Sequence, residues 1–264
     1  MAEEKSYRAQ QIPGSDIEVR KISVHDLWQS LKEGFDDFNA KPSYGVFLIV
    51  IYPLFALLAT LFVVGENMRY LAFPLIAGLT LLGPVISVAL FEMSRRREQS
   101  LELRWQAAFD FVYSPSFAPI LALSVVIMLL YIAWLFLAQL IYIGTFGTDM
   151  PISIPDFWTL LVTTRQGAGL IIYGLGVGFL FAFTTMAISV VAFLLLLDKP
   201  VSAATAVAIS FRAVTANLLV MALWGISVAV LLAIGALLFL VGLAAVLPIL
   251  GHATWHIYRK VVEP

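Results

Sequence analysis

Long apolar segments recur along this chain, and they restrict its fold more than any other feature. A helix needs about 20 apolar residues to cross the roughly 30 Å hydrocarbon core of a bilayer. Segments of this kind lie at 44–65, 71–93, 117–143 and 170–197. The stretch 217–258 has no Asp, Glu, Lys or Arg and would be about 63 Å long as one helix, so we expect it to fold back near Gly235 into a fifth and a sixth span.

The composition also indicates a membrane protein. Hydrophobic residues make up 61% of the 264 residues and charged residues only 12%, whereas soluble domains carry about 25% charged residues. The chain has no cysteine, which excludes disulfides, thiolate metal sites and cysteine nucleophiles. We therefore predict an all-α, polytopic membrane protein with six transmembrane helices.

A short amphipathic segment precedes each pair of spans. In each segment a small residue is followed by phenylalanine, and the pairs are Gly34-Phe35, Ala108-Phe109 and Ser210-Phe211. Residues around each pair, mostly apolar, share the offsets 0, 4, 7, 8 and 11, which is a helical spacing. Ser23 and Asp26 are spaced as a capping box, so we expect the first of these helices to start there.

The ends of the second spans give an independent sign of repetition. Residues 84–92 align without gaps on 248–256, and 186–194 fit the same frame. The amphipathic segment and the second-span end thus recur in the same order along the chain, which favours an internal repeat. We expect three parallel helical hairpins, at about 23–97, 98–199 and 200–262, each introduced by a cytoplasmic amphipathic helix. They would form a single six-helix membrane domain over 21–262, after a flexible cytoplasmic tail at 1–20.

The distribution of Lys and Arg predicts the orientation, because short cytoplasmic loops carry an excess of these residues. Of the 16 Lys and Arg, only Arg69 and Arg165 fall on the opposite side from the rest. Both termini are therefore expected in the cytoplasm. The amphipathic helices either lie along the inner leaflet or extend the spans inward. In an insertion at 144–169, Asp156 is expected to cap a further interfacial helix on the far side.

Two histidines in the last span are the strongest candidates for chemistry. His252 and His256 are four residues apart, a spacing at which both imidazoles face one side of a helix and can share a metal ion. Glu92 occupies the repeat position equivalent to His256, so one hypothesis is a metal or proton site formed by all three residues. The alternative is that His256 and Glu92 lie near the headgroups, where Glu92 pairs with an arginine. Ser87 and Ser189 are further candidates, for a polar path through the spans.

Other classes of site lack support in the sequence. No GxGxxG, Walker, GxSxG or HExxH motif is present, so no catalytic residue is predicted, and no cofactor other than a metal ion. The net charge of −1 gives no support for a nucleic-acid partner. The basic run at 95–97 is better explained as the flank of a span beside anionic lipid.

Both ends of the chain carry recognisable motifs. Near the start are Ile22-Ser-Val-His-Asp-Leu27, Gly34-Phe-Asp-Asp-Phe38 and Pro42-Ser-Tyr-Gly45, and near the end is Leu247-Pro-Ile-Leu-Gly-His-Ala-Thr-Trp-His-Ile-Tyr-Arg259. They resemble the terminal signatures of an uncharacterised bacterial family of predicted integral membrane proteins, domain of unknown function 2189. The resemblance covers about residues 20–262. It implies a bacterial inner-membrane location and about six helices, and no activity.

The function expected first is that of a non-enzymatic scaffold or assembly factor that binds membrane lipids or another membrane protein. Polar groups are scarce within the spans, whereas small residues suited to helix packing are abundant. A transporter or channel for a small solute is the second hypothesis. The third is a metal- or proton-binding membrane protein, or a metal-dependent enzyme, that uses the two histidines and Glu92.

Overall fold

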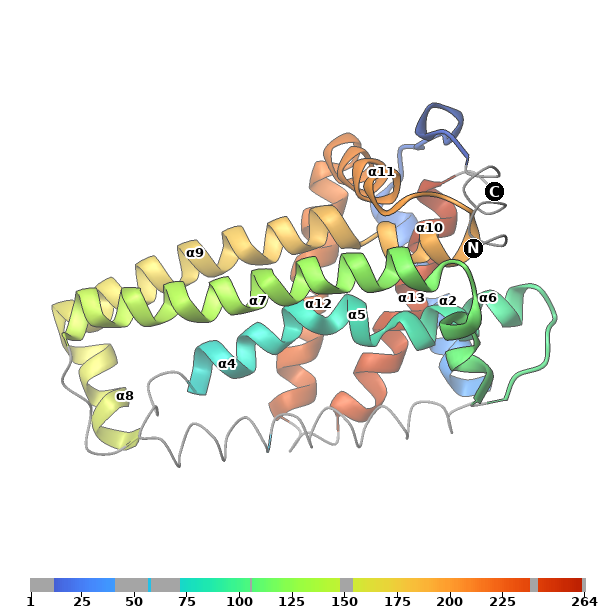
Figure 1. Cartoon of the computed structure of the whole chain (residues 1–264). Helices are drawn as coiled ribbons and strands as arrows, with labels where there is room; N and C mark the ends of the chain where they lie inside the picture. Colours follow the sequence, from blue (N-terminus) through green and yellow to red (C-terminus); the bar gives the residue numbers. More distant parts are fainter. Residues whose placement is uncertain are drawn as a thin grey trace. The chain divides into compact units, whose positions relative to one another are not determined.

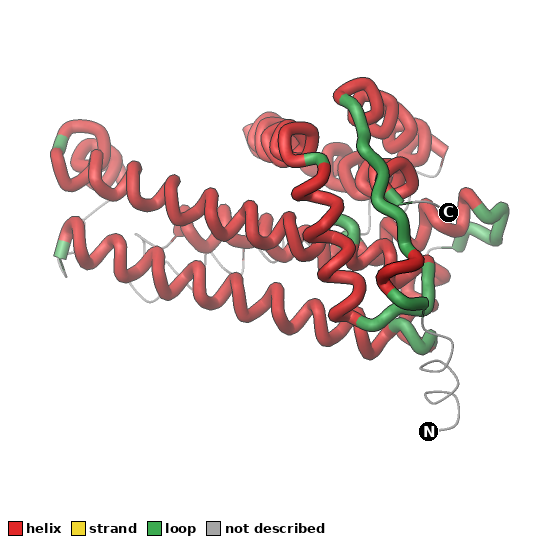
Figure 2. The backbone as a smooth tube through the Cα atoms, turned by 90° about the horizontal axis from the view of Figure 1, so that it is seen from above, coloured by secondary structure: helices red, strands yellow, loops and turns green. Residues whose placement is uncertain are grey.

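The structure, a computed structural model, describes residues 12–40, 57, 72–104, 106–147, 154–237 and 242–262. In these ranges the regular structure is helical (Figure 2), apart from an isolated antiparallel bridge between Val19 and Val262. The all-α prediction is therefore confirmed for the described part of the chain. The first span, expected at 44–65, lies outside it except for Leu57.

Four described segments are long and apolar enough to cross a membrane, namely Phe73–Glu98, Phe117–Phe146, Arg165–Asp198 and Leu218–Leu237. They correspond to the second to fifth predicted spans. The fifth is helix α12 (Leu218–Leu237), and α13 (Leu243–Val261) follows it, so the helix does break beside Gly235. α13 is not among the four candidates, and six spans remain a prediction.

Local sequence divides two of these segments into shorter helices. The first contains α4 (Ala72–Leu79), the 3₁₀ helix η3 (Thr80–Leu82), α5 (Gly83–Ile86) and α6 (Val88–Glu98). Pro84 accounts for this interruption, because it has no N–H group and its ring obstructs the preceding turn. The third contains α9 (Arg165–Ser189) and α10 (Ala192–Asp198), separated at two β-branched valines of low helix propensity.

The chain forms two compact units, of which one comprises Tyr52–Gly83 and Val126–Thr185. This unit contains α7 (Phe117–Phe146) from Val126 onward and α9 as far as Thr185, which run side by side (Figure 1). Trp134 of α7 lies in a core with Leu81, and its indole N–H donates to the Pro74 carbonyl at 2.8 Å. This hydrogen bond fastens α4 to α7. The insertion contains the expected short helix, α8 (Ile154–Thr163), although Asp156 lies in its first turn rather than at its N-cap.

The other unit comprises Met1–Ile51, Pro84–Val125 and Met186–Pro264. It contains α2 (Val24–Ala40), which starts at the predicted capping box. The Ser23 N–H donates to the Asp26 carboxylate at 2.7 Å, and the Asp26 N–H donates to the Ser23 hydroxyl at 3.3 Å. It also contains α11 (Ala203–Ala216), capped by the Ser202 hydroxyl, which accepts from the Thr205 N–H at 3.0 Å. The first and third amphipathic helices therefore lie where the sequence predicted them.

The second amphipathic segment differs from the prediction. In place of an α-helix from about Leu101, the chain forms a 3₁₀ helix, η4 (Gln106–Tyr113). Ser100 has a φ of 55°, a left-handed turn that redirects the backbone directly after α6. The residues of η4 are rich in aromatic side chains, which are weaker helix formers, and Pro115 follows closely. These local preferences prevail over the amphipathic pattern.

Helices α6, α10 and α13 pack against one another pairwise, and an amphipathic element packs on each of them. The three contacts are α2 on α13, η4 on α6, and α11 on α10, and we call them the joints. The small residue of each small–Phe pair lies at its joint. Gly34 lies so close to α13 that an added Cβ would be 2.6 Å from the Ala253 nitrogen. Ala108 shares a buried cluster with Ala89 of α6. The Ser210 hydroxyl accepts a hydrogen bond from the Val191 N–H at 3.2 Å.

The predicted tail at 1–20 is described from Ile12 onward, and this part is hydrogen-bonded to the helices. The Ile12 N–H donates to the Pro200 carbonyl at 2.9 Å, and the Arg20 N–H donates to the Val261 carbonyl at 2.8 Å. The Asn217 side-chain amide donates to the Arg20 carbonyl at 2.9 Å. Backbone groups between residues 12 and 20 therefore have hydrogen-bond partners in the helices, and the flexibility of the tail stays a prediction.

Candidate functional site

Asp37, in the last turn of α2, is the centre of a polar cluster between α2, α6 and α13. Its carboxylate accepts hydrogen bonds from the Ser94 hydroxyl at 2.8 Å and from Nε2 of His256 at 3.0 Å. The Arg97 guanidinium donates to the other carboxylate oxygen. The side chain of Asp37 is only 8% exposed, so these three donors replace the water that burial removes.

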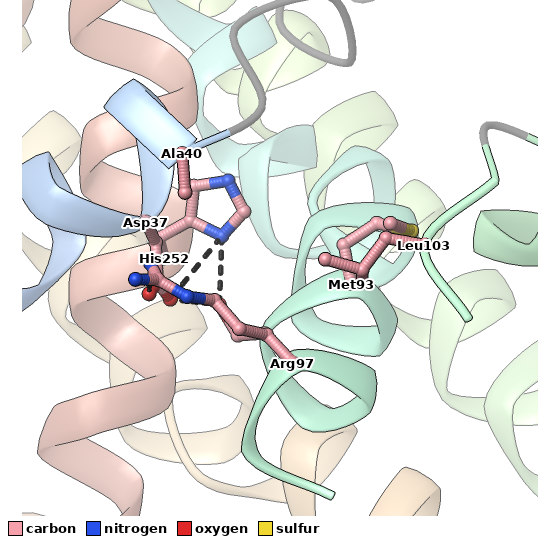
Figure 3. Close-up of a pocket in the computed structure, with 7 residues that line it drawn as sticks. Asp37, Ala40, Met93, Arg97, Leu103 and His252 are labelled. Atoms are coloured by element: carbon pink, nitrogen blue, oxygen red, sulfur yellow. Dashed lines mark hydrogen bonds and ion pairs between the residues drawn. The ribbon is translucent and has the colours of Figure 1, made fainter. Parts of the chain in front are cut away.

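The direction of these hydrogen bonds follows from chemistry. Ser94 has one hydroxyl proton, and it donates this proton to Asp37. Nδ1 of His252 lies 2.7 Å from the same hydroxyl oxygen, so His252 must donate to Ser94. His252, Ser94 and Asp37 therefore form a chain of hydrogen bonds that ends at the carboxylate. Figure 3 shows Asp37, Arg97 and His252 pointing toward one another from three different helices.

The surroundings of Asp37 keep it ionised. Burial by itself would raise the pKa of the Asp37 carboxyl, but hydrogen bonds from His256 and Ser94 and the charges of the histidines lower it further than burial raises it. The net pKa lies below the ordinary value. The carboxylate form is the one that can accept all three hydrogen bonds.

A second carboxylate of α2 extends the cluster toward the end of α13. Glu33 forms an ion pair with Lys260 at 2.5 Å, and the same ammonium donates to the Ser30 hydroxyl at 3.2 Å. Since Asp37 contacts His256 and Ser30 contacts Lys260, α2 runs antiparallel to α13. We call the set Ser30, Glu33, Asp37, Ser94, Arg97, His252, His256 and Lys260 the Asp37 cluster.

Glu92 lies in a different set of contacts. Its side chain is 2% exposed and pairs with Arg95 and with Arg96, each at 2.8 Å. Arg96 also binds Asp110 of η4 at 2.6 Å. The pairing with Arg95 is the alternative that the sequence left open. Glu92 thus serves the joint between α6 and η4.

Arg259 connects α13 to two other helices. It forms ion pairs with Glu98 of α6 at 2.9 Å and with Asp198 of α10 at 3.0 Å. Its guanidinium also lies over the ring of Trp255, 5.6 Å from the centroid, within the range of a cation–π contact. Asp198 in addition accepts from the Tyr258 hydroxyl at 2.7 Å. These contacts fasten together the ends of α6, α10 and α13.

A small pocket opens beside the Asp37 cluster, with a volume of about 20 Å³. Such a volume holds about one water molecule. The pocket is lined by Asp37, Ala40, Met93, Ser94, Arg97, Leu103 and His252 (Figure 3). Ser87 and Ser189 are not among its lining residues, and Ser189 is itself 1% exposed.

The structure brings together only part of the predicted metal or proton site. His252 and His256 face the same partner, Asp37, at 3.9 and 3.0 Å, whereas the contacts of Glu92 are with arginines. Within the described ranges, no group of three or more His, Cys, Asp or Glu side chains has a geometry that could hold a metal ion.

Of the eight members of the Asp37 cluster, the sequence indicated only His252 and His256. Asp37 stands next to another acid, Asp36, and such a charged pair is typical of the exposed face of an amphipathic helix. Its spacing contained the missing signal, because Ser30, Gly34 and Asp37 are separated by four and three residues and so share one helix face. Ser30 and Gly34 are buried, which places Asp37 on the same packed side.

Comparison with known proteins agrees with the membrane assignment. Neither a search of the curated proteins nor a search of the solved structures gives a match. A family model matches residues 72–198, which include three of the candidate spans in whole or in large part and lie between the two terminal motifs. Its description is "Predicted integral membrane protein (DUF2189)", and this is the family that the terminal motifs resemble.

Proposed function

We propose that this integral membrane protein is a non-enzymatic scaffold that binds membrane lipids or another membrane protein. The observation that carries the proposal is that the ionisable side chains of the candidate site bind one another. The carboxylates of Asp37, Glu92 and Glu98 are all paired with cations of the same chain. A site arranged in this way holds helices together, and the pocket beside it has room for about one water molecule.

The surface of the spans supports an association with lipid. Large apolar side chains are exposed along α7 and α9, for example Leu129 at 60%, Phe136 at 63% and Phe179 at 67%. Such exposure is costly in water and favourable in a bilayer. We place the chain in a bacterial inner membrane with the Asp37 cluster on the cytoplasmic side, in accord with the distribution of Lys and Arg. The antiparallel course of α2 along α13 favours amphipathic helices that extend the spans inward.

The joints support three repeats in a closed arrangement. Ala89, Val191 and Ala253 occupy equivalent positions in the aligned second spans, and these are the residues that meet Ala108, Ser210 and Gly34. Each amphipathic element therefore packs on the end of the preceding repeat, and the first element packs on the end of the last. The alignment of the small–Phe pairs and the alignment of the second-span ends were made separately. The residues that they make equivalent are the ones in contact at each joint.

A direct test is purification from native membranes in polymer nanodiscs, with an unrelated membrane protein carrying the same tag as control. Mass spectrometry should recover a lipid or a membrane protein at a fixed ratio to the chain after extensive exchange, and the control should lack it. Repeated recovery of the bare protein would contradict the scaffold. Solute flux through reconstituted vesicles would instead support the transport hypothesis, which stays a prediction along with the metal site.

A further inference from the structure

The three joints differ in what they bury, although the proposed repeats make them equivalent. The positions aligned with His252 are Val88 and Val190, and those aligned with His256 are Glu92 and Leu194. At the α11–α10 joint both positions are therefore apolar, and Leu194 is fully buried. At the α2–α13 joint both are histidines: His256 binds Asp37 directly, and His252 reaches it through Ser94. The α6–η4 joint is polar as well, because Glu92 pairs with Arg96, which binds Asp110 of η4. The α11–α10 joint is therefore the apolar one of the three.

The two amphipathic α-helices also differ in the surface that holds them. α11 buries Ala206, Ile209, Ser210, Ala213 and Val214. α2 fully buries only Leu27, Ser30 and Gly34, while Leu31 and Phe38 are half-buried, so a single large apolar side chain of α2 is fully buried. Hydrogen bonds and ion pairs of Asp37 and Glu33 add to the close packing of Gly34 on α13. The ion pair of Glu33 with Lys260 is partly exposed, and an exposed pair contributes little net stability because water competes for both partners.

Water does reach the edge of the α2–α13 joint. The side chains of Arg97, Glu33 and Lys260 are 39%, 32% and 19% exposed. The pocket of about 20 Å³ lies at the same joint and is lined by Asp37 and Arg97. Water can therefore solvate both sides of the ion pairs when the helices separate, so separation does not leave unpaired buried charges.

We infer that α2 is a releasable latch, and that the α2–α13 joint opens while the α11–α10 joint stays closed. The inference rests on the closed three-repeat arrangement proposed above. Release frees Arg97, His256 and Lys260 from the two α2 carboxylates and so presents a basic surface. The ion pairs that hold the latch make its opening sensitive to salt, which screens exposed charges at a Debye length of about 3 Å at 1 M.

Thiol labelling can test the latch because the chain has no cysteine of its own. Ser30→Cys and Ser210→Cys form a matched pair, since both serines are fully buried on amphipathic helices at the two joints. In nanodiscs, we expect a water-soluble maleimide to modify Ser30→Cys about tenfold faster than Ser210→Cys, as local opening predicts. The ratio should rise in 1 M salt and in the background Asp37→Asn.

Hydrogen exchange of the unmodified protein provides the second measurement, which does not depend on the folding of any variant. Amides of 24–40 should exchange faster than those of 203–216, and more so in 1 M salt. Equal protection of both helices, with equal labelling of both cysteines, would overturn the latch and leave the scaffold proposal intact. Fast exchange in both helices would instead contradict the closed arrangement on which the latch rests.

Discussion

Replacement of Asp37 by alanine tests whether its cluster holds α2 in place. The substitution leaves Ser94, Arg97 and His256 without the carboxylate that they share. Breaking a buried ion pair by removal of one partner costs about 3–5 kcal/mol. Arg97 is 39% exposed and can regain water, so we expect a loss near the lower limit, about 3 kcal/mol.

The neighbouring residue gives a matched control. Asp36 is an exposed acid in the same turn of α2, and Asp36→Asn should change the free energy of unfolding by no more than about 0.5 kcal/mol. Asp37→Asn keeps the shape and one acceptor of the side chain, so its loss should be intermediate, about 1.5–3 kcal/mol. Thermal unfolding in detergent, followed by circular dichroism, should rank the variants as wild type, Asp36→Asn, Asp37→Asn, Asp37→Ala. An Asp37→Ala variant as stable as Asp36→Asn would refute the role given to the cluster.

Three further predictions concern other features of the same region. Gly34→Ala should destabilise the protein by about 1–3 kcal/mol, because the new Cβ would lie 2.6 Å from the backbone of α13. The control Gly174→Ala, whose Cβ would have no neighbour within 4 Å, should be neutral or stabilising. Equal melting temperatures of the two variants would contradict the close approach of Gly34 to α13. The lowered pKa of Asp37 stabilises the fold at pH values above the ordinary aspartate pKa of about 3.9. This contribution is lost as the pH falls through the folded-state pKa. The free energy of unfolding should therefore fall less steeply below about pH 4 in Asp37→Asn than in the wild type. Elemental analysis of the purified protein should find no metal at a fixed ratio to the chain. A metal that is present at a fixed ratio and is lost in His252→Ala would support the metal-site hypothesis instead.

The spans and two amphipathic helices could be predicted because each depends on residues close in sequence. Hydropathy over about 20 residues locates a span, and the capping box at Ser23 and Asp26 locates the start of α2. η4 could not be predicted from its apolar pattern alone, because the left-handed Ser100 and weak helix formers acted against that pattern.

The Asp37 cluster was harder to predict because its members come from three helices that are far apart in the sequence. Asp37 and His256 are 219 residues apart, and Ser94 and His252 are 158 apart. Their pairing depends on which helix packs on which, and a single sequence gives no direct measure of that. The histidine spacing did indicate a shared partner, but it did not identify the carboxylate of α2 as that partner.

A closed set of equivalent joints has no preferred place to open, since every joint would carry the same contacts. Placing polar side chains at the α2–α13 and α6–η4 joints and apolar ones at the α11–α10 joint removes this equivalence. The joint that closes the proposed ring is also the one where chain connectivity matters least, because it links the first element to the last. α2 can leave α13 without separating neighbouring segments of the chain, whereas α11 follows directly on α10, after only a short link at 199–202. Charge sets two joints apart from the α11–α10 joint, and connectivity selects α2–α13 from these two, because η4 follows α6 along the chain after a short link. The comparison of Ser30→Cys with Ser210→Cys measures whether the α2–α13 joint is the one that opens.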